Sequence, residues 1–159
     1  LWISDSRIFK FMIKKFKLKE IFDKRGSFLK VFEKNKFKNF NIKDVYISTS
    51  KKDVFRGMHY QTDKYAQNKI IICLKGGIID FAYNLKTKKL SKNKLNDKSN
   101  YGLFIPKNYA HGFLSLKNNT QIISVCSEVF NSKKEKVIKL GSIDNSFYKK
   151  KLILSKKDS

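Results

Sequence analysis

Short apolar runs of strand length recur along the middle of the chain, and this feature constrains the fold most. Each run is rich in β-branched or aromatic residues. The runs lie at residues 45–50, 70–74, 78–83, 101–105, 112–116 and 121–125. Gly76 and Gly77 separate the second run from the third, and we expect a hairpin turn there. Short strands at regular spacing, with few helix signals between them, are typical of a β-sandwich, jelly roll or barrel. The sequence therefore predicts an all-β fold.

Two further segments fit this pattern less well. Residues 8–22 first alternate between apolar and polar as a strand does, and their later apolar residues also fit helical spacing. We favour a strand there. Residues 86–99 are polar, and we expect a solvated loop between strands.

The length of the chain and its apolar content indicate one folded unit. We expect residues 1–159 to form a single domain with a real core, since 41% of the residues are hydrophobic. No apolar run approaches the length of a membrane span, so we expect no membrane partner. The first residues lack the order of charge and apolarity that marks a signal peptide. The chain has no initiator Met, which leaves open a truncated or misassigned start, with residues 1–7 non-native or disordered.

The two cysteines, Cys73 and Cys126, stand far apart and form no C-x-x-C pattern. The sequence therefore does not indicate a disulfide framework. We expect two buried strand cysteines, in a protein of the reducing cytoplasm.

The formal net charge of +23 points first to a nucleic-acid partner, because basic side chains neutralise phosphates. However, the 36 basic residues include only three arginines, which leaves 33 lysines spread from Lys10 to Lys157. Abundant Lys, Asn, Ile and Phe with scarce Arg, Pro and Gly suggest the composition of an AT-rich genome. We therefore expect no nucleic-acid partner. The positive field would favour an anionic small substrate such as a nucleotide diphosphate.

The chain has two histidines, His59 and His111, and both lie in unusual local sequence. Before the first of them stand Arg56 and Gly57, and a glycine lets the backbone approach another group closely. Strand alternation places His59 on the face of Gly57 and Gln61, opposite to Arg56, unless a bulge intervenes. Histidine takes and returns protons near neutral pH, and a nearby lysine can stabilise an oxyanion. These residues suit proton abstraction beside a carbonyl, although a structural role for either histidine is the alternative.

Five short motifs follow one another along most of the chain. They are DKRGSF at residues 23–28, RGMHYQ at 56–61, QNK at 67–69, IPKNYAHGF at 105–113 and ILSKKD at 153–158. In order and spacing they resemble the signature segments of the dTDP-4-dehydrorhamnose 3,5-epimerase family. The resemblance extends from about residue 17 to residue 158.

This resemblance implies a double-stranded β-helix, the cupin jelly roll, with short C-terminal helical or irregular segments and assembly as a homodimer. The family uses neither a metal nor an organic cofactor, and two separated histidines without an H-x-H pattern agree with the absence of a metal site. Its substrate is dTDP-4-dehydro-6-deoxyglucose, whose ketone acidifies the hydrogens at C3 and C5. The implied reaction inverts these carbons on the way to rhamnose for surface polysaccharide such as O-antigen.

The resemblance also implies roles for single residues. His59 matches the catalytic base, Asp158 the carboxylate that hydrogen-bonds it, and Lys69 the residue that stabilises the enolate oxygen. As the next-to-last residue, Asp158 could instead be frayed and solvated. The substrate-binding positions of the family fall on Arg25, Phe28, Arg56, Gln61, Asp80 and His111. For Asp80, a structural hydrogen bond is an equally good explanation, because a buried carboxylate needs a partner.

The chain departs from the family at one position with direct chemical consequences. Ser124 stands where the family usually has a tyrosine, the proposed acid on the face opposite His59. Serine is a much weaker acid, and Tyr109 and Tyr60 are the neighbouring candidates to replace that tyrosine. Tyr46 stands where the family commonly has Asn.

These departures leave four functions to distinguish. The first is an epimerase that inverts both carbons, and the second is an epimerase that acts at C3 alone. The third is a sugar 3,4-ketoisomerase, which shares the jelly roll and a related enediol. The fourth is a degenerate nucleotide-sugar-binding protein that has kept the pocket and lost the acid.

Overall fold

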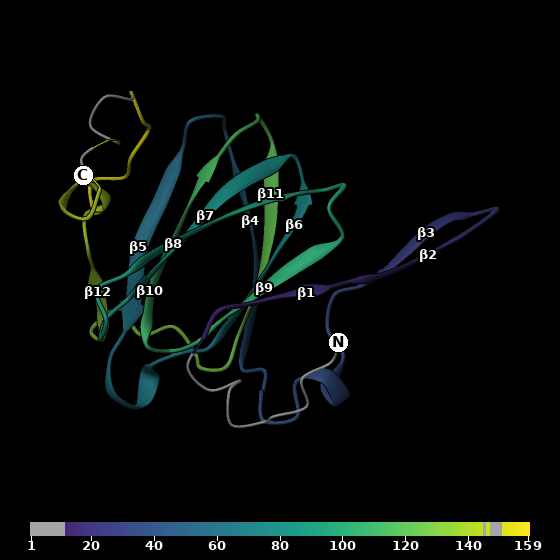
Figure 1. Ribbon diagram of the computed structural model, residues 1–159, viewed down its shortest axis with the longest axis horizontal. Coiled ribbons are helices and arrows are strands. Elements are labelled where there is room, and N and C mark those ends of the chain that lie inside the picture. Colours follow the sequence, from purple (N-terminus) through teal and green to yellow (C-terminus); the bar gives the residue numbers. More distant parts are fainter. Residues whose placement is uncertain (1–11, 145, 147–150) are drawn as a thin grey trace.

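The computed structural model describes residues 12–144, 146 and 151–159, so the expectations for residues 1–11 lie outside the described part. Most of the described chain forms two facing antiparallel sheets of five strands each, with a separate two-stranded hairpin (Figure 1). This arrangement is the jelly roll that was predicted. Within the described residues, three short 3-10 helices lie in the connections, namely η2 (Lys34–Lys36), η3 (Asp63–Tyr65) and η4 (Leu140–Ser142).

Along most of the chain, successive strands lie in alternate sheets. In spatial order, the first sheet contains β1 (Lys14–Lys17), β9 (Tyr101–Ile105), β6 (Lys69–Lys75), β11 (Thr120–Cys126) and β4 (Asp44–Ser50). The second contains β12 (Glu135–Val137), β5 (Phe55–Gln61), β10 (Tyr109–Ser115), β7 (Gly77–Asn84) and β8 (Leu90–Asn96). The hairpin consists of β2 (Lys19–Asp23) and β3 (Gly26–Lys30).

The main core lies between the sheets, and both sheets contribute to it. Its buried members include Ile71, Leu103 and Ile122 from the first sheet and Ile78, Ala82 and Phe113 from the second. The outer face of the first sheet packs against Phe37 and Phe40, which follow η2. The outer face of the second sheet packs against Leu140 and Leu152 near the C-terminus. Because central strands such as β6 are covered on both faces, residues 70–72 are all buried and read as a continuous apolar run.

The strands predicted from the sequence are confirmed, with ends that differ by at most three residues. The described part of residues 8–22 is extended, in β1 and β2, as expected. Both cysteines are free and buried, as also expected. Within the described residues, no helix is long and apolar enough to cross a membrane.

The expected hairpin at Gly76 and Gly77 is wrong. The turn joins β6 to β7, but β6 pairs with β9 and β11, whereas β7 pairs with β8 and β10. Only Gly76, at a φ of 82°, separates the two strands, and the commonest hairpins need two loop residues. The chain instead crosses here from one sheet to the other.

The expected loop at residues 86–99 is also wrong in its centre. Residues 90–96 form β8, which pairs with β7 along its whole length. Lys92 and Lys94 are exposed, while Leu95 is fully buried. Exposed lysines are favoured on edge strands because they prevent pairing with other chains. Because these lysines make the segment polar, its sequence resembles that of a loop.

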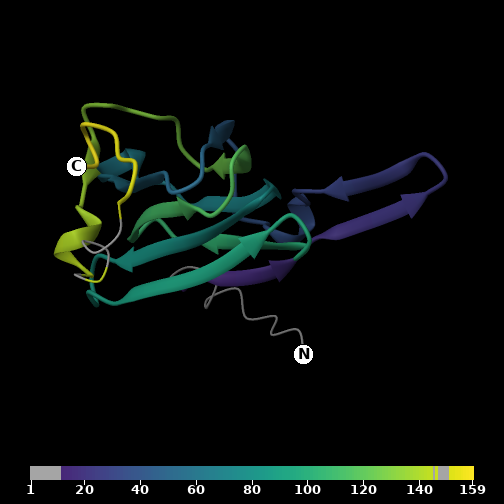
Figure 2. The ribbon, with the colours of Figure 1, turned by 90° about the horizontal axis from the view of Figure 1, so that it is seen from above.

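The β2–β3 hairpin extends beyond both sheets, away from the C-terminal segment (Figure 2). It carries exposed apolar side chains, namely Ile21, Phe22 and Phe28. Arg25 lies in its turn and forms hydrogen bonds with Asp23. The hairpin is therefore an apolar projection with little of its surface covered by the rest of the described chain.

Candidate functional site

A pocket of about 580 Å³ is open between the two sheets. This volume lies within the range of small-molecule sites. By sequence, ten residues fall on the family's catalytic, substrate-binding and acid positions. Six of these ten line the pocket, namely Arg56, His59, Lys69, His111, Ser124 and Asp158. A second pocket of about 230 Å³ adjoins the first, since Tyr46, His59 and Lys69 line both.

A bulge in β5 places Arg56 and His59 on the same side. His59 pairs with His111 and Arg56 pairs with Phe113, so two residues of β5 lie opposite the single residue Gly112. The inserted residue reverses the alternation between them. Regular alternation would have placed Arg56 on the face opposite to His59. This is not observed, because a bulge, the exception allowed for above, lies between the two residues.

Glycines allow the two strands to come close at this bulge. A Cβ on Gly57 would lie 2.6 Å from the Cα of Gly112 and 2.6 Å from the carbonyl oxygen of His111. Gly57 also has a φ of +116°, which L side chains rarely adopt. The expected close backbone approach beside Arg56 is thus confirmed. It involves the backbone of His111, which lines the pocket.

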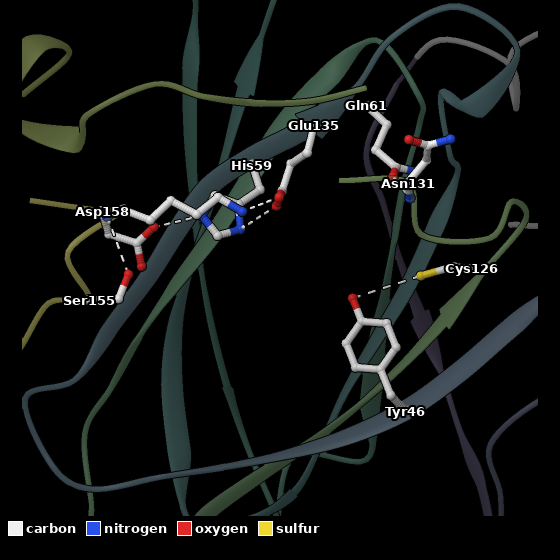
Figure 3. A network of polar contacts seen from close by, with 9 residues as sticks. Tyr46, His59, Gln61, Cys126, Asn131, Glu135, Ser155 and Asp158 are labelled. Carbon is white, nitrogen blue, oxygen red and sulfur yellow. Dashed lines mark hydrogen bonds and ion pairs between the residues drawn. The ribbon is translucent and has the colours of Figure 1, made fainter. Parts of the chain in front are cut away.

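Asp158 reaches His59 from the far end of the chain. Its Oδ1 lies 2.6 Å from His59 Nε2, and its side chain is only 4% exposed (Figure 3). The C-terminal segment is tied to the start of β5, because the backbone N–H of Phe55 donates to the carbonyl of Ile153 and that of Ile153 to Asp53. The alternative of a frayed and solvated Asp158 is therefore wrong.

Glu135 of β12 contacts the other nitrogen of the same ring, and sequence reasoning missed it. Its Oε1 lies 3.3 Å from His59 Nδ1, and Lys157 pairs with its second oxygen. The signal that could have revealed it is the pairing of Val137 with His59, which cannot be read from either segment alone. His59 is thus held between two carboxylates, with the shorter contact to Asp158.

His111 lies opposite His59 on the neighbouring strand and has its own carboxylate. His111 Nε2 and Asp80 Oδ2 are 2.6 Å apart, and both side chains are buried. Asp80 lies behind the pocket wall, because it is absent from the lining while His111 is part of it. Its second oxygen has no hydrogen-bond partner among the described residues. The structural hydrogen bond considered for Asp80 is present, and it fixes the His111 ring.

Lys69 lines the pocket from the first sheet, at the start of β6 and beside Cys126 of β11. Burial lowers the pKa of the Lys69 ammonium, and Cys126, Glu135 and Asp80 oppose that shift. A cation with little hydration interacts strongly with a developing negative charge nearby. The arrangement therefore combines an oriented histidine with a cation contributed by the opposite sheet.

Besides Asp80, three of the ten residues lie outside the larger pocket, namely Gln61, Arg25 and Phe28. Gln61 lines the smaller one, but its amide hydrogen bonds go to backbone groups of Tyr65, Val129 and Asn131. Arg25 and Phe28 lie on the projecting hairpin, where the Arg25 side chain is 83% exposed. Within one copy of the described chain, these two residues are not part of the site.

Comparison with known proteins connects this site to a family. The model of the dTDP-4-dehydrorhamnose 3,5-epimerase family matches residues 12–159. A curated epimerase of that name from Escherichia coli (strain K12) is 34% identical over 107 residues, which are 60% of this chain and 57% of that protein. Another, from Neisseria gonorrhoeae, is 32% identical over 126 residues, 73% of this chain and 38% of that protein. The chain thus spans less than two thirds of the length of these relatives.

The solved structures agree with the sequence comparisons. The crystal structure of dTDP-4-dehydrorhamnose 3,5-epimerase from Sulfolobus tokodaii matches with a TM-score of 0.84 at 35% sequence identity. The match covers 92% of this chain and 86% of that one. From its motifs, its jelly roll and these matches, the chain belongs to the dTDP-4-dehydrorhamnose 3,5-epimerase family.

Proposed function

We propose that the protein is an epimerase that acts on a nucleotide-linked 4-keto-6-deoxy sugar, dTDP-4-dehydro-6-deoxyglucose, to give the dTDP-4-dehydrorhamnose type of product. Family membership supports the reaction class, because the relatives named above are dTDP-4-dehydrorhamnose 3,5-epimerases. The single observation that carries the proposal is the His59–Asp158 contact of 2.6 Å in a pocket that Lys69 also lines. The product would serve cytoplasmic synthesis of rhamnose for surface polysaccharide.

In the proposed mechanism, His59 removes a proton from the carbon next to the ketone. Asp158 holds one ring nitrogen, and the substrate displaces the longer contact between the other nitrogen and Glu135. The electron pair moves onto the ketone oxygen, where the Lys69 ammonium stabilises the enolate. A proton returned to the opposite face completes the inversion and restores the ketone.

The test is incubation with dTDP-4-keto-6-deoxyglucose in heavy water, followed by NMR of the sugar. We expect deuterium at C3 and C5 with the wild type and none with His59→Ala. Deuterium at C3 alone would indicate an epimerase restricted to that carbon. A moved ketone would indicate a 3,4-ketoisomerase. A folded protein that exchanges at neither carbon would refute the proposed reaction.

We further propose that the active form is a homodimer in which the β2–β3 hairpin of one copy reaches the pocket of the other. Phe28 is 62% exposed, and an isolated two-stranded hairpin is marginally stable in water. A second copy would cover its apolar side chains and bring Arg25 and Phe28 to the nucleotide end of the site. Sedimentation analysis should give a dimer. Arg25→Ala should weaken dTDP binding more than Lys24→Ala, and a monomer with full activity would refute the arrangement.

A further inference from the structure

The pocket wall opposite His59 contains a small residue where an acid is needed. Ser124 of β11 lines the pocket and is almost fully buried. Inversion requires a donor on this side, because the proton that His59 removes must be replaced from the other face. A serine hydroxyl is a poor acid and also leaves unfilled the space that a larger side chain would occupy.

Tyr46 lies directly across from Ser124 on the neighbouring strand. In the antiparallel pairing of β4 with β11, these two residues face each other. Side chains of such a pair are on the same face of the sheet, with Cβ atoms about 4.5–5.5 Å apart. The Tyr46 ring therefore occupies the pocket side of β11, and the small Ser124 side chain makes room for it.

The Tyr46 hydroxyl lies inside the site, although the residue itself is exposed at the pocket mouth. It is 4.0 Å from the sulfur of Cys126, which is fully buried, and it interacts with the Ser124 side chain. In Figure 3 the hydroxyl points away from its own strand into the space that separates it from His59. Tyr46 and His59 belong to opposite sheets, and both line the large and the small pocket.

No other tyrosine among the described residues lines the larger pocket. Tyr109 packs against the core between the sheets, and Tyr60 packs against the cluster on the outer face of the second sheet while it touches only the smaller pocket. The two replacements considered from the sequence are therefore less well placed than Tyr46. The position of Tyr46 depends on the pairing of β4 with β11, which the sequence does not reveal.

We propose that Tyr46 is the acid that protonates the substrate carbon on the face opposite His59. The tyrosine that the family has on β11, at the position of Ser124, is thus replaced in this chain by a tyrosine on the adjacent strand β4. This inference rests on the proposed function. His59 takes the proton of the carbon next to the ketone, and the C–H electron pair forms the enolate. The enolate carbon then takes the Tyr46 hydroxyl proton, and the ketone forms again. Water reprotonates the phenolate, and His59 releases its proton to water.

The environment of Tyr46 agrees with a neutral phenol before the reaction. Burial raises the pKa of the Tyr46 hydroxyl above its ordinary value, and hydrogen bonding to Ser124 opposes this effect. Cys126 and Asp44 raise it further. The hydroxyl therefore keeps its proton at neutral pH, and the same shift makes it a weaker acid than an exposed phenol.

The test compares Tyr46→Phe with wild type in heavy water, with Tyr101→Phe as the matched control. Tyr101 lies in β9 and is absent from both pockets. We expect Tyr46→Phe to slow inversion by about 10²-fold or more. Deuterium exchange with retained configuration should persist, because His59 can still remove a proton and return it to the same face. A merely structural role for Tyr46 would lower exchange and inversion together.

A second variant tests whether a tyrosine at position 124 can replace Tyr46 as the acid. The double variant Tyr46→Asn, Ser124→Tyr moves the tyrosine to β11, and we expect inversion within about tenfold of the wild type. Inversion by Tyr46→Phe as fast as by Tyr101→Phe would overturn the inference and leave the proposed function standing. A folded double variant as slow as Tyr46→Phe would also overturn it. Absence of exchange in the wild type would refute the proposed function, and the inference with it.

Discussion

At Gly57, the backbone of β5 approaches that of the paired strand β10 closely, beside His59 and His111. A substitution at this glycine tests whether the site depends on that close approach. Gly57→Ala introduces a Cβ that meets the Cα of Gly112 and the carbonyl oxygen of His111, both at 2.6 Å. These neighbours are backbone atoms, so they cannot move aside as a flexible side chain can. The substitution also forces alanine to a φ of +116°.

The two effects can be estimated separately. Overpacking in a well-packed region costs about 1–3 kcal/mol. A non-glycine residue in a sparsely populated backbone region costs about 1–3 kcal/mol as well. We therefore expect Gly57→Ala to lower the free energy of unfolding by about 2–6 kcal/mol, with a drop in Tm of roughly 2–4 °C per kcal/mol for a chain of this size. Because the clash involves His111 itself, the folded fraction should also lose exchange activity.

Two other glycines provide matched controls. Gly26 has a φ of +129°, but a Cβ there would meet nothing within 4 Å, so Gly26→Ala should show the backbone cost alone, about 1–3 kcal/mol. A Cβ on Gly77 would make ordinary contacts at 3.6 Å, and Gly77→Ala should change stability by less than about 0.5 kcal/mol. Urea denaturation of the three variants gives the order directly. If Gly57→Ala proved as stable as Gly26→Ala, the close approach of β5 and β10 would not be the constraint described above.

Three further predictions follow from the same contacts. Asp158→Asn should slow deuterium exchange by about 10²–10⁴-fold without unfolding the protein, because His59 loses its charged partner; a loss below tenfold would contradict this. Lys69→Met should abolish exchange yet raise the urea midpoint, since burial lowers the pKa of Lys69 and charging this residue costs folding free energy; a lower midpoint would contradict that. Burial raises the pKa of Cys73 from 9.0 to about 11 and also raises that of Cys126, so the folded state keeps protons that the unfolded state loses. The free energy of unfolding should therefore be unaffected by these thiols below pH 9 and should fall between about pH 9 and 11; the fall should be smaller in Cys73→Ala than in the wild type, and an equal fall would refute this origin.

The sequence by itself determined most of the central strands and the histidine and charged side chains that line the larger pocket. Runs of β-branched and aromatic residues specify extended structure locally, and their spacing selects an all-β architecture. The motifs RGMHYQ and ILSKKD named His59 and Asp158 correctly as neighbours, although they are 99 residues apart. This pairing came from the resemblance of both motifs to those of the family, because the contact cannot be read from either local pattern.

Only the tertiary structure decided how the strands meet. The bulge that turns Arg56 toward the side of His59, the crossing at Gly76 and the edge strand at residues 90–96 all depend on partners elsewhere in the chain. The same is true of Tyr46, whose place beside Ser124 follows from the register of β4 on β11. Strand register is set by the burial of whole faces across the sheets, since a shift of one residue would move every side chain to the other face. Local sequence therefore specifies which segments are strands, whereas the packing of the two sheets specifies which side chains share the pocket.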